Sequence, residues 1–164
     1  MSNVVVKEST AQAGEHVIHD YLIFQLGGQA FCIHVGQVRD VLRTQKLTHV
    51  PLSASAIAGV MNLRGHIVTA VDARIALAIE PADAKGHEMN IVVEFRDNLY
   101  SIIVDSVRDV ITFHASEMDT NPSILEGKLR DISNGVIKRD DELIICLDVA
   151  RLFATVKVPQ GEEI

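Results

Sequence analysis

Tryptophan is absent from this chain of 164 residues, and aromatic residues together make up only 4% of it. So few aromatics argue against a large aromatic-lined ligand pocket. Cysteine occurs twice, at Cys32 and Cys146, in separate apolar runs and without a CxxC pair, so we expect buried thiols rather than a disulfide scaffold. The sequence has no uncharged apolar stretch of about 18 residues and no signal-peptide layout at its N-terminus. These absences predict a cytoplasmic protein without direct membrane insertion.

Positive charge is also scarce, because 15 basic residues stand against 22 acidic ones and the net charge is −7. This excess repels phosphate backbones and argues against nucleic acid as a partner. The sequence contains no phosphate-binding glycine loop, nucleophile elbow, HExxH motif or metal-spaced Cys/His set. His16 and His19 have a loosely metal-like spacing, but no further ligand supports them and a solvated pair is the favoured interpretation. We therefore expect no enzyme, no cofactor and no metal.

What the chain does contain is a series of short apolar runs rich in Val and Ile, the residues that strands favour. The runs are YLIFQL, AFCIHV, HIVTAVD, NIVVEF, LYSIIVD and ELIICLD. Turn-forming residues separate them at 27–28, 62–65, 97–98 and 140–141, which predicts hairpin connections. Many short strands with tight turns indicate a mainly β protein built as a sandwich or barrel.

Helix signals are few. Asp72 precedes ARIALAI and Asp148 precedes VARLFAT, and each aspartate is suited to cap a short helix. Residues 1–19 and 155–164 lack a sustained pattern, so we expect them to be terminal tails around an ordered domain at 20–154.

An internal repeat predicts the architecture. Residues 31–41 read FCIHVGQVRDV and residues 100–110 read YSIIVDSVRDV, an offset of 69. Residues 59–77 and 135–153 align at an offset of 76, from GVMNLRG and GVIKRDD at their starts to the capping aspartates. Two ordered blocks predict two similar barrel lobes, in which Phe31 matches Tyr100 and Asp72 matches Asp148.

The repeat also shows a difference between its copies, since Arg64 in NLRG aligns with Asp140 in KRDD. The shared fold tolerates either sequence at this turn. We therefore expect NLRG to be retained for something other than the fold.

Three segments together resemble the CheW family of bacterial chemotaxis adaptors, over about residues 20–154. GVMNLRGHIVTAVDAR at 59–74 is similar to the family signature GVxNLRGxIVPVVDLR, YLIFQLGGQAFCIHVGQVRDVL at 21–42 resembles its opening hairpin, and IIVDSVRDV at 102–110 resembles its second-lobe strand pair. The resemblance implies two SH3-like five-stranded β-barrels with a few short helices. On this basis we expect a first lobe at about 20–86 plus a C-terminal segment, and a second lobe at about 87–145.

The resemblance further implies a non-catalytic scaffold that binds the cytoplasmic tip of a chemoreceptor and the regulatory domain of a CheA-type histidine kinase. Val38, Asp40 and Arg64 match the family's receptor-binding positions. Val38 and Asp40 lie two apart on an extended segment, so we expect their side chains to share a face. For Arg64, a charge-assisted contact within the protein and one to a receptor side chain are both open.

Four further positions match candidate partner contacts of the family. Gly59 and Val110 are explained equally well by a turn glycine and a core valine. Asp119 and Ile124 stand where many members carry an Arg and a Phe that join adaptors and kinases into rings, which makes ring formation by that route an open question.

Two other functions remain open at this point. One is a CheW-like adaptor of a chemosensory pathway unrelated to motility. The other is a small β-barrel that binds an apolar ligand, although small barrels usually fill with their own side chains.

Overall fold

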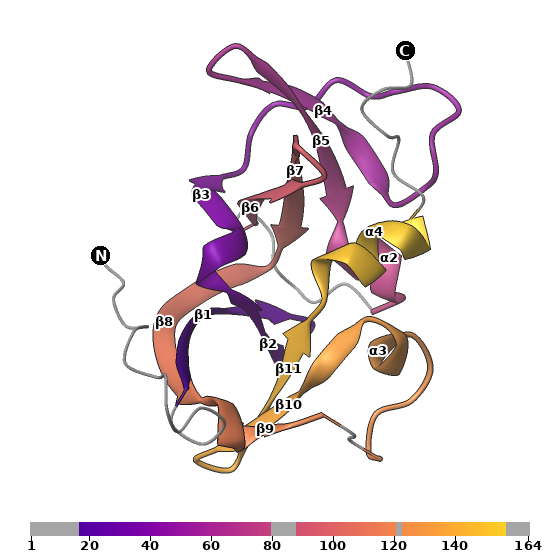
Figure 1. Cartoon of the computed structure of the whole chain (residues 1–164). Coiled ribbons are helices and arrows are strands. Elements are labelled where there is room, and N and C mark those ends of the chain that lie inside the picture. Colours follow the sequence, from indigo (N-terminus) through magenta and orange to yellow (C-terminus); the bar gives the residue numbers. More distant parts are fainter. Residues whose placement is uncertain (1–16, 80–87, 121–122, 157–164) are drawn as a thin grey trace.

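The computed structural model describes residues 17–79, 88–120 and 123–156, and their strands form two curved sheets, each containing one parallel pair (Figure 1). We call these the six-stranded lobe and the five-stranded lobe. In spatial order the six-stranded lobe contains β8 (Ser106–His114), β1 (Ile18–Leu26), β2 (Gln29–His34), β11 (Glu142–Leu147), β10 (Ser133–Arg139) and the two-residue β9 (Met118–Asp119). The five-stranded lobe contains β3 (Val38–Arg43), β6 (Met89–Phe95), β7 (Asn98–Val104), β5 (His66–Asp72) and β4 (Ile57–Leu63).

The helices are short. They are the 3-10 helices η2 (Val35–Gln37) and η3 (Ala115–Glu117) and the α-helices α2 (Ala73–Leu77), α3 (Gly127–Asp131) and α4 (Val149–Val156). The prediction of a mainly β, two-lobed protein with a few short helices is confirmed. Among the residues that the structure describes, no helix is long and apolar enough to cross a membrane.

Four tight turns connect the hairpins. Each consists of two residues with positive φ, at 27–28, 64–65, 96–97 and 140–141, as expected for the turns that match strand twist. The third lies one residue before the predicted break at 97–98, because Asn98 already pairs with Phe95 at the base of the hairpin. Arg96 therefore adopts a left-handed conformation that its residue type did not suggest.

The strand registers confirm the internal repeat. Phe31 in β2 lies opposite Ile145 in the parallel strand β11, and Tyr100 in β7 lies opposite Thr69 in the parallel strand β5. These two pairs are related by the offsets of 69 and 76. The capping aspartates are equivalent too: the Asp72 and Asp148 backbone N–H groups donate to carbonyls 16 residues upstream, at 2.7 and 2.8 Å.

The two copies exchange their opening hairpins. The six-stranded lobe combines β1 and β2 from the first copy with β8 to β11 from the second, whereas the five-stranded lobe combines β6 and β7 with β3 to β5. Figure 1 shows this as indigo strands among orange ones. The expected division of the lobes near residue 86 is therefore wrong. A repeat shows which segments are equivalent, but it does not show which copies pair. The hydrogen bonds between strands join backbone groups that all residues share, so the sequence of a strand does not identify its partner.

A core shared by both lobes holds them together. Helix α4 follows β11 of the six-stranded lobe, and its buried Phe153 packs against Phe95 and Tyr100 of the other lobe, with ring centroids 5.3 and 4.8 Å apart. A second cluster inside the six-stranded lobe contains Cys32 and Cys146, which lie side by side, buried and free, as predicted.

Most of the predicted terminal tails, namely residues 1–16 and 157–164, lies outside the described residues. Strand β1 already begins at Ile18, and α4 continues to Val156.

Candidate functional site

Asp40 and Arg64 form an ion pair at the surface of the five-stranded lobe. Arg64 Nη1 lies 2.9 Å from Asp40 Oδ2, and the side chains are 71% and 27% exposed, respectively. Strand β3, which carries Asp40, is at one end of the sheet, and the β4–β5 turn, which carries Arg64, is at the other. The ion pair therefore joins the two ends of a curved sheet, while leaving most of the guanidinium in water.

Val38 and Asp40 do not share a face, contrary to our expectation. Val38 lies opposite Val93 and Asp40 lies opposite Val92, so one extra residue bulges out of β3 between them. A bulge reverses the alternation of side chains. Val38 consequently packs against the core shared by the lobes, whereas Asp40 points to the other face. The Asp40 carboxylate also accepts a bond of 2.9 Å from the Val41 N–H, which supports the bulged backbone.

The backbone conformation and a close neighbouring segment require glycine at position 59. Its φ of 149° lies outside the range that side chains favour, and a Cβ there would stand 2.6 Å from the Thr48 carbonyl oxygen. Gly135, the equivalent residue, has a φ of 150° and would meet the Asp119 carbonyl oxygen at the same distance. The close approach of a neighbouring backbone segment therefore accounts for glycine at both positions.

Val110, Asp119 and Ile124 belong to the other lobe. Val110, on β8, is 54% exposed, so it is not the core valine that we considered as one alternative. Ile124 is 57% exposed and lines a hollow of about 350 Å³ beside the β10–β11 turn. Asp119 pairs through its backbone with Val136 in β10. The structure thus divides the candidate residues between two surfaces instead of bringing them together.

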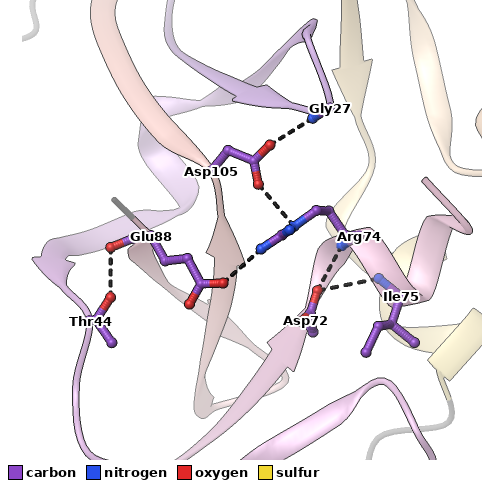
Figure 2. Close-up of polar contacts among 7 residues, drawn as sticks. All are labelled: Gly27, Thr44, Asp72, Arg74, Ile75, Glu88 and Asp105. Carbon is purple, nitrogen blue, oxygen red and sulfur yellow. Dashed lines mark hydrogen bonds and ion pairs between the residues drawn. The ribbon is translucent and has the colours of Figure 1, made fainter. Parts of the chain in front are cut away.

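A buried charged cluster was missed by our sequence reasoning (Figure 2). Arg74 Nε lies 2.9 Å from Asp105 Oδ1 as an ion pair that is not aligned as a hydrogen bond, and these side chains are 12% and 9% exposed. The other Asp105 oxygen accepts a bond of 2.7 Å from the Gly27 N–H. Arg74 Nη2 also lies 2.7 Å from Glu88 Oε2. The signal was present, since Arg74 follows the capping Asp72 in the signature and Asp105 lies in the second-lobe motif.

Local structure positions this cluster. Asp72 caps α2 by accepting bonds from the Arg74 and Ile75 N–H groups at 3.0 and 3.3 Å, which places Arg74 in the first turn. Thr44 Oγ1, just after β3, donates to the carbonyl of Glu88, just before β6, at 2.8 Å. This bond fixes the position of Glu88 beside the end of β3. Arg74 thus lies between two carboxylates that come from different segments.

His19 and His34 form a smaller polar cluster at one end of the six-stranded lobe, where their rings approach to 3.2 Å between Nδ1 and Nε2. The Gly36 N–H donates to His34 Nδ1 at 2.9 Å, which leaves the proton of the neutral ring on Nε2. Burial, and secondly the charge of His19, lower the pKa of His34. In the part of the chain that the structure describes, no three His, Cys, Asp or Glu side chains are grouped to hold a metal ion.

A family model described as a CheW-like domain matches residues 20–157. The chain belongs to the CheW family. Among its relatives are the chemotaxis protein CheW of Thermotoga maritima, 32% identical over 87% of this chain and 92% of the relative, and that of Bacillus subtilis, 32% identical over 77% and 81%. Protein PilI of Pseudomonas aeruginosa is 27% identical over 74% of this chain and 68% of its own length.

A solved structure agrees with the fold of this CheW-family chain. The scaffolding protein TtCheW of Thermoanaerobacter tengcongensis superposes with a TM-score of 0.77, at 24% sequence identity and over 89% of this chain and 97% of that one. The relatives in Bacillus subtilis, Klebsiella aerogenes and Thermotoga maritima are named chemotaxis proteins, and the chain is an adaptor of chemotaxis signalling.

Proposed function

We propose that this adaptor couples the cytoplasmic tips of chemoreceptors to the regulatory domain of a CheA-type histidine kinase, in the cytoplasm at membrane-bound receptor arrays and without catalysis of its own. The observation that carries the receptor side of this proposal is the exposed Asp40–Arg64 ion pair. It presents a guanidinium with free N–H donors on a hairpin turn, next to an edge strand.

The receptor surface of this proposal consists of Asp40 and Arg64, and Val38 supports it from the opposite face of β3, where it packs against the shared core. An exposed ion pair contributes about 0–1 kcal/mol to stability, so opening it costs little. Arg64 then pairs with a receptor carboxylate in an interface where water is excluded. Removing one partner of such a buried charge pair costs about 2–5 kcal/mol of binding. The internal contact and the receptor contact are therefore successive states of one side chain.

The kinase surface of this proposal lies on the six-stranded lobe. Exposed Val110 and Ile124 offer apolar contacts there, and the hollow beside Ile124 can accept a protruding side chain of the kinase. Asp119 lies at the edge of that lobe. Because the family's usual Arg and Phe are replaced here, we propose that this surface binds a kinase with a matching change in charge, rather than the usual ring partner.

An adaptor of a different chemosensory pathway is the second candidate. The match to Protein PilI favours it, because that relative is not named as a chemotaxis protein. The same receptor and kinase surfaces serve both candidates, so they differ in their partners and not in their mechanism.

Reconstitution tests the proposal. Receptor in membrane discs, the CheA-type kinase of the source cell and this protein are mixed, and kinase autophosphorylation is measured. We expect kinase activity to depend on receptor only when this protein is present, and we expect the repurified protein alone to hydrolyse no ATP. Receptor control of the kinase without this protein, or ATP turnover by the protein itself, would contradict the adaptor function. Co-purification from the native cell then distinguishes the two pathways by the kinase recovered.

A further inference from the structure

Within the residues that the structure describes, the strands cross between the two lobes twice, and the crossings are built differently. The first crossing follows β2 through η2, and the second follows β7 through Asp105. The internal repeat relates them, since Gly36 precedes Asp105 by the offset of 69. Only the second crossing carries a buried charged side chain.

At the second crossing, Asp105 contacts both lobes. Its backbone N–H donates to the Gln25 carbonyl at 3.1 Å, and its Oδ2 accepts from the Gly27 N–H at 2.7 Å, so it is bound to the β1–β2 hairpin of the six-stranded lobe. Its Oδ1 faces Arg74 at 2.9 Å, on the helix that follows β5 of the five-stranded lobe. One carboxylate thus joins the lobes, as Figure 2 shows.

The fold does not require this charge pair. The residue equivalent to Arg74 is Ala150, and the residue equivalent to Asp105 is Gly36, so the symmetry-related junction forms without either charge. A buried ion pair is in any case weak evidence for stability, because the cost of removing both charges from water offsets their attraction. In some proteins such pairs instead favour one geometry over others, because only one arrangement satisfies both charges.

We infer that Arg74 and Asp105 are positioning residues that fix the orientation of the two lobes, and that this orientation holds the receptor bound at Arg64 and the kinase bound at Val110 in one relative geometry. The second part rests on the proposed function, whereas the first concerns the free protein alone. Glu88 completes the arrangement by holding the outer end of the guanidinium at 2.7 Å.

Residual dipolar couplings of backbone amides test the first part, because they report the orientation of each lobe without a partner. For the native protein we expect one alignment tensor to fit both lobes. For Arg74→Gln and for Asp105→Asn, which keeps an acceptor for the Gly27 N–H, we expect separate tensors. Arg108→Gln, a matched change in an exposed ion pair within one lobe, is the control and keeps a single tensor. A single unchanged tensor in both Arg74→Gln and Asp105→Asn overturns the inference.

An apolar replacement separates orientation from stability. The double variant Arg74→Met with Asp105→Leu replaces both charges by apolar side chains, so we expect its melting temperature to approach the native value while its lobes still require two tensors. If it keeps the native orientation, packing alone positions the lobes and the inference is wrong. This variant also decides the matter if a single variant fails to fold.

Binding tests the second part. We expect Asp105→Asn to bind a receptor-tip fragment and the kinase regulatory domain separately with native affinity, and to bind the receptor fragment about tenfold more weakly than the native protein does when the kinase domain is already bound, within the range of typical coupling between sites. Unchanged affinity for the receptor fragment in the presence of the kinase domain, despite altered lobe orientation, overturns the second part. A native protein that binds no receptor fragment instead contradicts the proposed function, and the dipolar couplings still decide the role of Arg74 and Asp105.

Discussion

In both lobes an ion pair joins the third strand of one repeat copy to a hairpin turn, but the charges are reversed. In the five-stranded lobe, Asp40 on β3 contacts Arg64 in the β4–β5 turn, with 2.9 Å between Oδ2 and Nη1. In the six-stranded lobe, Arg108 on β8 contacts Glu142 beside the β10–β11 turn, with 2.8 and 3.2 Å between two pairs of atoms. The elements that the tie joins are therefore repeated, whereas its residues and its polarity are not, since Arg108 aligns with Arg39 and Glu142 with His66.

This reversal has a consequence for recognition. The exposed turn of the five-stranded lobe carries the positive Arg64, and that of the six-stranded lobe carries Asp140 and Asp141 next to Glu142. Two surfaces of similar shape and opposite charge attract different partners, because like charges across an interface are costly. A duplicated fold can in this way hold a receptor with one lobe and a kinase with the other.

The largest expected effect on stability tests a feature that the lobes share, a glycine packed against a neighbouring carbonyl. Gly59→Ala and Gly135→Ala each place a methyl group 2.6 Å from a carbonyl oxygen at a positive φ. We expect each substitution to reduce the free energy of unfolding by about 2–4 kcal/mol, as strain and clash add, and by similar amounts in the two lobes. Urea denaturation measures this. A Gly59→Ala protein of native stability that has lost partner binding would instead make Gly59 a contact residue.

A smaller effect tests where the lobes differ. Arg64→Ala and Arg108→Ala each remove an exposed ion pair, so we expect losses of about 0.2–1 kcal/mol, the larger for Arg108 because it uses two N–H donors. Double-mutant cycles with Asp40→Ala and Glu142→Ala isolate each pair energy. A loss well above 2 kcal/mol for Arg64→Ala would show that the five-stranded lobe depends on its tie for folding.

The smallest effect concerns a histidine present in one lobe only, since His34 aligns with buried Ile103. Its pKa is lowered in the folded protein, so the unfolded chain binds a proton more readily. The contribution of neutral His34 to the free energy of unfolding is therefore complete above the unfolded pKa of about 6.5. It is lost as the pH falls through that value, because the unfolded chain then binds the proton first. We expect a slight fall in melting temperature between about pH 7.5 and 5.5 that is reduced in His34→Gln. A slope that is identical in the variant assigns the effect to other groups.

Sequence reasoning succeeded where local chemistry decides the structure. The runs rich in Val and Ile became strands, and Asp72 and Asp148 lie at the starts of α2 and α4 because a short acceptor side chain satisfies free N–H groups in any context. The repeat made Phe31 and Tyr100 equivalent, because both copies need an aromatic residue in the core.

It failed where the structure depends on contacts between distant segments. Each opening hairpin could pair with the remaining strands of its own copy or with those of the other copy, and both pairings use the same kind of backbone hydrogen bond. The bulge between Val38 and Asp40 adds a residue that no pattern of polarity reveals, and it reverses the face of one residue. Arg74 and Asp105 lie 31 positions apart in two separate motifs, so their contact and their burial become visible only when both lobes are assembled.

The affinity of Arg64→Asp for a receptor-tip fragment, measured by calorimetry together with its melting curve, tests the account most directly. We predict a binding loss of about 2–5 kcal/mol, with little change in melting temperature and unchanged affinity for the kinase regulatory domain. Adding Asp40→Arg restores the internal ion pair with reversed charges and, on this account, leaves receptor binding lost. Full receptor affinity in Arg64→Asp would contradict the assignment of Arg64 to the receptor surface.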